Sequence, residues 1–406
     1  MDERPLVAQW PVARMMLMAT TGFTGFYVTL SALPAQIASR GGSTASAGAA
    51  TTVMLAATVV CQPLIPALLR RLSTSAVVAL GMVVLGAPAP ALIWAGSGAW
   101  LYAICLLRGV GFAIFTIAGT VSTGEIAPPG RHGELAGLYG LAAALPNVAL
   151  VPLSVLLLHV VGFWPVAVIA ALPVPGALLA ISGGWRTPLS EADLFGPGSD
   201  GDRAADGDRP RLAGRGAIGR TLTPAAVLCS LTVAGGAVVT ILPIARPGFV
   251  ATAGLALFGA TAAAARWQAG ARVRRHGVAR LLPSACVVAA AGLMALAAGL
   301  SGGGAAVVLV ACAATGVGYG AAQSLTLVSA FARAGPPARA TASAVWNVAF
   351  DSGTAVGAIL IGALIATSLG IWGAFAVLAA LALAVVPLGA ASGPRAAGEV
   401  RRRARG

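Results

Sequence analysis

The chain has 406 residues, of which 58% are hydrophobic and only 9% are charged, and its mean hydropathy is +0.89. A soluble domain usually carries about a quarter charged residues, so this composition excludes an ordinary soluble protein and predicts a membrane protein. The net charge of +14 comes from arginines that lie mainly in short clusters beside apolar segments, a placement that favours anionic lipid headgroups over nucleic acid. Lysine is absent, which removes the lysine of an ATP-binding P-loop.

Twelve apolar stretches are long enough to cross a bilayer, which takes about 20 residues. The first six cover residues 12–38, 47–69, 76–96, 99–121, 134–158 and 162–182. The other six cover residues 222–244, 248–268, 279–300, 303–331, 339–368 and 370–390. We therefore predict an all-α membrane protein with twelve transmembrane helices in two pseudo-symmetric six-helix bundles.

The hydrophilic segments divide the chain into four parts. The predicted boundaries are an N-terminal half at 1–185, a linker at 186–221, a C-terminal half at 222–392 and a basic tail at 393–406. The linker combines six carboxylates and six arginines with many Gly and Pro residues, a composition typical of a flexible, hydrated connection.

The arginines also predict the orientation of the chain. If both termini are cytoplasmic, 22 arginines fall on the cytoplasmic side and only Arg40 and Arg246 on the other. Cytoplasmic loops of membrane proteins are enriched in Arg and Lys, so this asymmetry predicts cytoplasmic termini. The basic residues are all Arg and the chain is rich in Ala and Gly, which favours a bacterial protein of the inner membrane. We expect it to be a monomer.

Sequence patterns for enzymatic chemistry are missing from the chain. The five cysteines lie in apolar segments without CxxC spacing, so neither a disulfide framework nor a zinc site is predicted. There is no HExxH motif, no pair of carboxylates within the apolar stretches and no Gly-x-Ser-x-Gly turn. We expect no cofactor, no metal site and no enzyme activity.

The two halves resemble each other at a separation near 205 residues. Matching features recur in the same order: Leu33-Pro34 with Leu242-Pro243, Gln62 with Arg266, Gly109-Val-Gly111 with Gly316-Val-Gly318, and Tyr139 with Trp346. Each match is weak alone, but the common order and nearly constant offset predict a repeat. An even number of helices in each half makes that repeat parallel in the membrane.

A degenerate loop motif follows the second helix of each half. The motif has the form Gly-x-x-x-Asp-Arg-x-Gly, and the second copy retains Gly270, Arg275 and Gly277, whereas the first retains only Arg71. Its Asp position is occupied by Arg70 and Arg274. With the fourth-stretch sequence Arg108-Gly-Val-Gly111, these residues resemble the major facilitator superfamily.

The resemblance implies a secondary active transporter that alternates its access as one half rocks against the other around a midplane site. The segment Trp346-Asn347-Val-Ala-Phe-Asp351 is similar to that of bacterial exporters of hydrophobic compounds and small metabolites. We therefore expect proton-driven export of a hydrophobic or amphipathic molecule. Uptake of a small metabolite is the alternative, and a membrane receptor or enzyme is a third possibility. The resemblance also implies that the loop residues Arg70, Arg71, Gly270, Arg274, Arg275 and Gly277 act in gating.

Two ionisable residues lie near the predicted bilayer midplane, where an isolated charge is costly. Asp351 is the only carboxylate in the interior of a predicted span, which makes it a candidate for proton coupling. Arg108 is a candidate charge on the substrate cavity. A structural hydrogen bond to a neighbouring helix is the alternative for each.

Further polar and aromatic residues are candidates for the substrate cavity: Tyr139, Asn147, Gln323, Trp346 and Asn347. Helix packing is the alternative for this group, because polar groups in membrane helices commonly bond to neighbouring helices. Gln62 and Arg266 are repeat partners near one membrane face. They are expected to act either in gating or as interface anchors.

Overall fold

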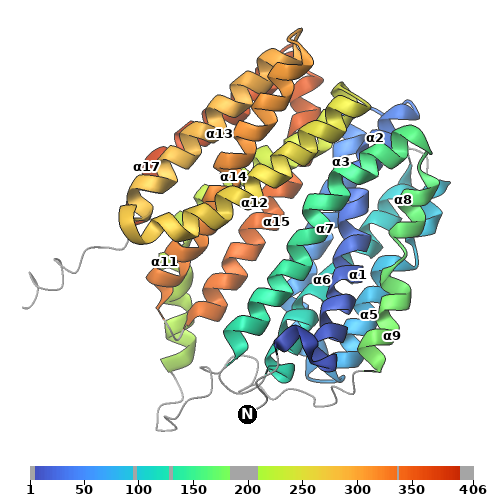
Figure 1. Cartoon of the computed structure of the whole chain (residues 1–406), viewed down its shortest axis with the longest axis vertical. Helices are drawn as coiled ribbons and strands as arrows, with labels where there is room; N and C mark the ends of the chain where they lie inside the picture. The colour runs from blue at the N-terminus through green and yellow to red at the C-terminus, as the bar shows by residue number, and fades with distance from the viewer. Residues whose placement is uncertain (1–4, 95–97, 128–130, 183–208, 336–337, 394–406) are drawn as a thin grey trace, which may run out of the picture. The chain divides into compact units, whose positions relative to one another are not determined.

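The computed structural model describes residues 5–94, 98–127, 131–182, 209–335 and 338–393 (Figure 1). All regular elements in these residues are helices, and twelve helical segments are long and apolar enough to cross a membrane. This confirms the predicted fold class and all twelve stretches. The segments are Trp10–Ser39, Thr44–Leu69, Thr74–Ile93, Ala99–Ile126, Gly137–Val160, Trp164–Ile181, Ile218–Ala245, Phe249–Val273, Val278–Leu300, Ala305–Ala334, Thr341–Ile365 and Gly370–Ala391.

Several membrane segments of the first half consist of more than one helix. In chain order the elements are η1 (Leu6–Ala8), α1 (Trp10–Leu30), α2 (Ala32–Ser39), α3 (Thr44–Cys61), η2 (Gln62–Leu64), α4 (Ile65–Leu69), α5 (Thr74–Gly86), η3 (Ala89–Ile93), α6 (Ala99–Ile126), α7 (His132–Val160), α8 (Trp164–Ile169) and α9 (Pro173–Ile181). Proline accounts for the breaks. Pro34, for example, has no N–H to donate to the Leu30 carbonyl, and α1 gives way to α2 at Ser31.

The second half has longer uninterrupted helices. They are α11 (Arg209–Ala245), α12 (Phe249–His276), α13 (Val278–Leu300), α14 (Ala305–Ala334), α15 (Arg339–Ile365), α16 (Gly370–Ala384) and α17 (Val386–Ala391). The two halves therefore differ in where their helices are broken. Helix α11 continues through Pro243, whereas the corresponding segment of the first half is divided into α1 and α2 near Pro34.

Two helix ends differ from the sequence prediction. Helix α11 begins at Arg209, inside the segment predicted as a linker up to residue 221. Helix α6 extends to Ile126 and carries Glu125 in its last turn, so Asp351 is not the only carboxylate on a membrane helix. The linker residues 186–208 and the tail residues 394–406 lie outside the described residues.

The chain forms two compact units that are not identical to its two sequence halves. Unit 1 comprises residues 1–196, 236–259 and 354–371, and unit 2 comprises residues 197–235, 260–353 and 372–406. The predicted boundaries of the two sequence halves, at residues 185, 222 and 392, remain a prediction. Unit 1 therefore includes three described stretches of helix that come from the second half: the ends of α11 and α15 and the first part of α12.

Hydroxyl groups connect these stretches to the rest of unit 1. Ser31 Oγ donates to the Val239 carbonyl at 2.9 Å, and Thr52 Oγ1 donates to the Ala355 carbonyl at 2.6 Å. Gly48 lies so close to the Ala358 carbonyl that any side chain there would collide with it. Helix α3 and the end of α15 thus pack through small residues and hydroxyl-to-backbone hydrogen bonds, a mode well suited to membrane helices.

Candidate functional site

Six aromatic rings gather inside unit 1. Three come from α1, two from α6 and one from α7: Phe23, Phe26, Tyr27, Phe112, Phe115 and Tyr139. We call these residues the aromatic cluster. Their spacing on α1 and α6 follows the three- and four-residue intervals that place side chains on one helix face. The Phe26 and Phe112 rings stack with centroids 3.8 Å apart, and the Phe23 and Phe115 rings meet edge to face at 5.1 Å.

Tyr139 brings a polar atom into this apolar environment. Its side chain is buried, and its ring lies 5.9 Å from that of Phe23. The Thr120 hydroxyl lies beside the Tyr139 hydroxyl but donates to the Thr116 carbonyl, and no group in the described residues forms a hydrogen bond of good geometry with the Tyr139 hydroxyl. A buried hydroxyl without a partner is costly, so this group is a candidate to bond a ligand.

Arg108 lies in the interior of unit 1, on α6, and its side chain is fully buried. One terminal nitrogen donates to the Leu85 carbonyl of α5 at 3.1 Å. The other donates to the Gly25 carbonyl of α1 at 2.7 Å and to Thr29 Oγ1 at 3.1 Å. The guanidinium therefore connects three membrane helices through oxygen atoms that carry partial negative charge.

The Arg108 side chain is enclosed by α1, α5 and α6 and forms hydrogen bonds between helices, the alternative considered from the sequence. Its role on a substrate cavity stays a prediction. Gly25 itself serves close helix packing, because a side chain at this position would collide with Pro173 of α9.

A smaller aromatic group occurs in unit 2. The Trp346 and Phe350 rings of α15 stack with centroids 5.6 Å apart, and Tyr319 of α14 lies 6.5 Å from Phe350. Trp346 Nε1 donates to Thr326 Oγ1 at 3.1 Å, which ties α15 to α14. Tyr139 and Trp346 are repeat partners, but the indole N–H is bonded to protein whereas the phenol hydroxyl is not.

The remaining cavity candidates have different surroundings. Asp351 is half-buried on α15, one turn beyond the exposed Asn347, whose amide donates to the Ser343 carbonyl of its own helix. Gln323 is buried on α14, and Asn147 is half-buried on α7. Trp346, Asn347 and Asp351 thus lie on one helix of unit 2, while Asn147 belongs to unit 1.

The predicted gating residues lie at turns near helix ends. Arg70 and Arg71 are exposed in the turn after α4, and Arg275 is exposed near the end of α12. Gly277 has a φ of 73°, a left-handed conformation that favours glycine and allows the sharp turn into α13.

The other predicted gating residues are divided between the two units. Gly270 has open space around it, and the Arg274 side chain lies outside the described residues. Gln62 is half-buried where α3 ends, and Arg266 is exposed on α12. Their gating roles remain predictions.

Part of the aromatic cluster was missed from the sequence. Phe23, Phe26 and Phe115 were not singled out, although Phe23, Phe26 and Tyr27 share one face of α1. That spacing was a usable signal, but it is common in any packed helix. Only the contacts with α6 and α7 distinguish this face from the others.

The chain is similar to one known protein family and to solved structures of membrane transporters. Residues 15–358 match the family model described as Major Facilitator Superfamily. A bacterial homologue of the human lysosomal transporter Spinster, in an inward-facing and unoccupied conformation, is similar with a TM-score of 0.73 and 14% identity, over 97% of this chain and 96% of the other.

Two further solved structures have the same fold. The nucleoside transporter NupG gives a TM-score of 0.71 and 11% identity, over 95% of this chain and 99% of that one. A POT family transporter in complex with a thioalcohol-conjugated peptide gives a TM-score of 0.70 and 14% identity, over 93% of this chain and 94% of that one. No curated protein sequence matches the chain. The family match and the twelve membrane helices lead to one conclusion: the chain belongs to the major facilitator superfamily and is a multi-pass membrane transporter.

Proposed function

We propose that the protein exports a hydrophobic or amphipathic small molecule in exchange for protons, across a bacterial inner membrane with both chain termini in the cytoplasm. The observation that carries the proposal is the aromatic cluster, a group of mostly buried rings in the interior of unit 1 with no carboxylate among them. Apolar and aromatic walls with few polar groups are typical of sites that bind hydrophobic ligands.

The Tyr139 hydroxyl supplies the polar element of this recognition. It is buried among the rings of Phe23 and its neighbours, and an acceptor on a substrate would complete its hydrogen bonding. Both terminal nitrogens of Arg108 donate to backbone and hydroxyl oxygens, and Nε is the one guanidinium nitrogen without a partner in the described residues, so most of the guanidinium is directed at protein atoms. These features favour an uncharged or amphipathic cargo over a carboxylate.

Asp351 is the proposed site of proton coupling. It is a half-buried carboxylate in the interior of a membrane helix, where protonation removes the cost of a charge at depth. Glu125 is the other carboxylate within the described membrane-spanning segments, but it lies in the last turn of α6 and accepts a hydrogen bond from Thr74 Oγ1 at 2.6 Å. Its position near the helix end makes it less suited to coupling at midplane depth.

The test is transport of a fluorescent amphipathic dye in proteoliposomes with an imposed pH gradient. Exchange predicts that dye accumulates in vesicles that are acidic inside, and Asp351→Asn should abolish this accumulation. Glu134→Gln is the matched control, because Glu134 is an exposed carboxylate paired with Arg131 at 2.8 Å outside the membrane spans. Dye movement in the same direction as protons would favour uptake. Undiminished gradient-driven transport by Asp351→Asn would remove that residue from coupling.

A further inference from the structure

A lateral cavity lies in unit 2 between α12, α13 and α14. Its volume is about 150 Å³, and most of the lining is apolar: Ala265, Ala269, Leu281, Ala285, Val288, Val317, Ala321 and Leu325. Three polar side chains complete it, those of Gln268, Arg272 and Ser284. All three are exposed, so the cavity is open at the surface of the helices.

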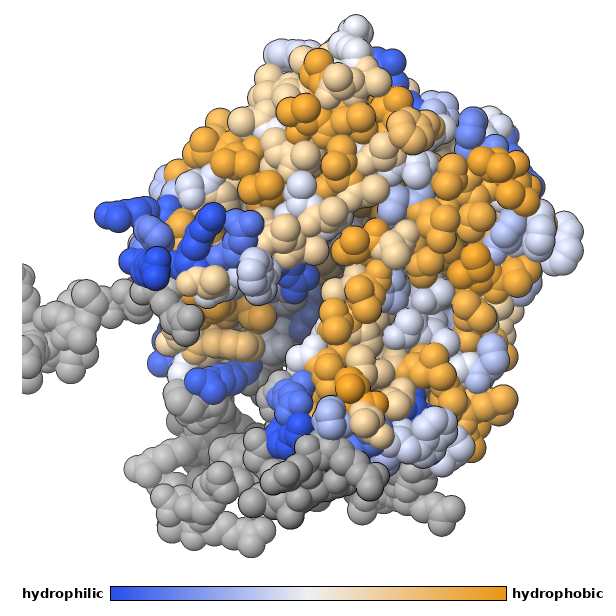
Figure 2. Space-filling model, in the orientation of Figure 1, coloured by the Kyte–Doolittle hydropathy of each residue, from blue (hydrophilic) through white to orange (hydrophobic). Residues whose placement is uncertain are grey.

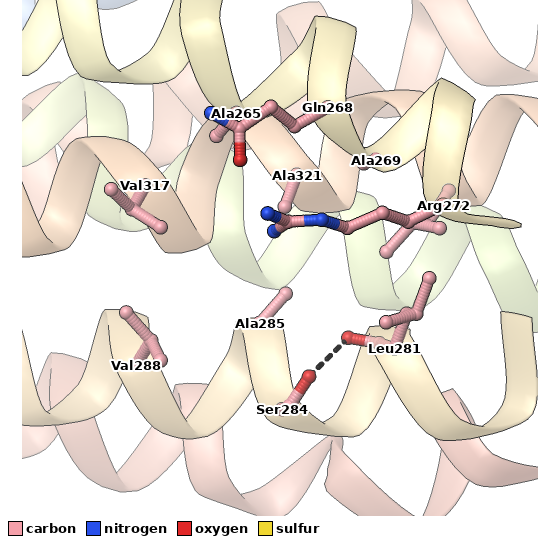
Figure 3. Close-up of a pocket in the computed structure, with 11 residues that line it drawn as sticks. Ala265, Gln268, Ala269, Arg272, Leu281, Ser284, Ala285, Val288, Val317 and Ala321 are labelled. Carbon is pink, nitrogen blue, oxygen red and sulfur yellow. Dashed lines mark hydrogen bonds between the residues drawn. The ribbon is translucent and has the colours of Figure 1, made fainter. Parts of the chain in front are cut away.

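The Arg272 guanidinium places a positive charge in the lining of this cavity. Figure 3 shows it extending into the space between α12 and α13, with Ser284 and Ala285 on the facing helix. Within the described residues, no hydrogen bond or ion pair is recorded for this guanidinium. Ser284 Oγ donates to the Leu281 carbonyl at 2.8 Å, and its lone pairs and the Gln268 amide remain near the cavity.

The surrounding sequence contains no carboxylate to neutralise this charge. From Arg209 to Phe350 the chain has no Asp or Glu at all. The same interval carries further arginines at the turn between α12 and α13, among them the exposed Arg275 and Arg280. Figure 2 shows hydrophilic residues gathered at this turn beside a largely hydrophobic surface. The counter-charge must therefore come from outside the chain or from distant parts of it.

The charged residue and the valines of the lining lie at opposite ends of the cavity, as the headgroup and acyl chains do in a lipid. Arg272 lies one turn before the end of α12, whereas Val288 lies ten residues into α13, or about 15 Å along the helix at 1.5 Å per residue. The charged end of the cavity is thus close to the membrane surface, and its apolar end is at the depth of acyl chains. Basic sites between membrane helices commonly bind anionic headgroups.

We propose that this cavity binds an anionic phospholipid, with the phosphate held by Arg272 and part of an acyl chain lying against Val288 and Val317. Guanidinium binds phosphate through a planar pair of N–H donors, which suits a headgroup at the mouth of the cavity. The cavity holds only part of the lipid, and the remainder stays in the surrounding bilayer. This inference is independent of the cargo and of the direction of transport.

The test is native mass spectrometry of the full chain in detergent with phosphatidylglycerol or phosphatidylcholine added. We expect one retained phosphatidylglycerol, and we expect Arg272→Gln to weaken its binding about five-fold. Arg280→Gln is the matched control, because it removes the same charge from the same turn without touching the cavity. Ser284→Leu should also reduce binding by filling the cavity, whereas Ala306→Leu, at an exposed site elsewhere on α14, should not.

Four results would overturn the proposal. Equal retention of the two lipids would remove the need for an anionic headgroup. Equal losses with Arg272→Gln and Arg280→Gln would indicate general surface charge. Full retention by both Arg272→Gln and Ser284→Leu would exclude the cavity. Displacement of the lipid by inorganic phosphate at millimolar concentration would identify a site for soluble anions instead.

Discussion

Helices α6 and α14 occupy corresponding positions in the sequence repeat, and their glycines pack in the same way. Gly111 of α6 lies against the Leu85 backbone of α5, where an added side chain would collide. Gly318 of α14 lies equally close to the Ala285 backbone of α13. Each unit thus uses a glycine to bring two membrane helices into close contact, as is common where lipid supplies no hydrophobic driving force.

The same two helices differ in the residue one turn earlier. Arg108 of α6 bonds to oxygens of α1 and α5, whereas its counterpart Thr315 of α14 is buried and bonds to the Ala311 carbonyl of its own helix at 2.8 Å. The repeat therefore preserves the packing of the scaffold and not its polar chemistry.

The largest expected effect comes from Arg108→Ala. It removes three hydrogen bonds and leaves a void, so we expect a loss of about 3 kcal/mol in stability. Thr315→Ala should cost less than about 1 kcal/mol, because only one bond within a helix is lost. A thiol-reactive dye that reports exposure of the buried cysteines 105, 286 and 312 measures both midpoints on heating. Unchanged stability of Arg108→Ala with lost transport would restore the cavity-charge interpretation.

The second prediction concerns the shared glycines. Gly111→Val and Gly318→Val should each destabilise the protein by about 1–3 kcal/mol, because the new side chains overlap neighbouring backbone. Gly140→Val on α7 is the control, since open space surrounds that residue. The same heating assay applies. A large effect at only one of the two sites would show that the packing is not equivalent in the two units.

The third prediction separates the repeat partners Tyr139 and Trp346. Trp346→Phe loses the hydrogen bond to Thr326 and should cost about 1 kcal/mol in stability. Tyr139→Phe removes a hydroxyl that forms no hydrogen bond of good geometry with the described residues, so stability should be maintained while the KM for the dye rises. Measuring both quantities for both variants tests the assignment. A strongly destabilised Tyr139→Phe with unchanged KM would make the phenol structural.

The smallest expected effects concern two arginines, one in each half, that bond to a carbonyl at the end of the last helix of that half. Arg14 donates to the Ser182 carbonyl just after α9 at 2.7 Å, and Arg333 donates to the Ala391 carbonyl at the end of α17 at 2.7 Å. Arg14→Gln should cost about 1 kcal/mol because the side chain is buried, and Arg333→Gln about 0.5 kcal/mol because it is more exposed. Raising the salt concentration should reduce the stability lost in Arg333→Gln but not the stability lost in Arg14→Gln. Equal salt sensitivity of the two variants would contradict the difference in burial between Arg14 and Arg333.

The helices could be predicted well because their signal is local. A span needs about 20 apolar residues whatever its neighbours are, so hydropathy located all twelve. The end of α6 and the start of α11 were less accurate, since polar residues such as Glu125 and Arg209 can extend a helix beyond its apolar core. The sequence offers no sharp boundary where a helix leaves the membrane and continues.

The candidate site could be predicted only in part. Tyr139 and Trp346 were identified through the repeat, but their different hydrogen bonding depends on Thr326, which lies on another helix. Phe23, Phe26 and Phe115 were missed, because aromatic residues at helical spacing are common and their mutual contacts are not local.

The amino-acid sequence by itself determined the membrane class, the twelve spans and the repeat, because each depends on composition and order along one helix. Only the tertiary structure decided which atoms the Arg108 guanidinium binds. A buried charge is costly, and whether it faces a cavity or bonds to neighbouring helices depends on which oxygens approach it. Those oxygens belong to Gly25, Thr29 and Leu85, and only folding brings them to the guanidinium.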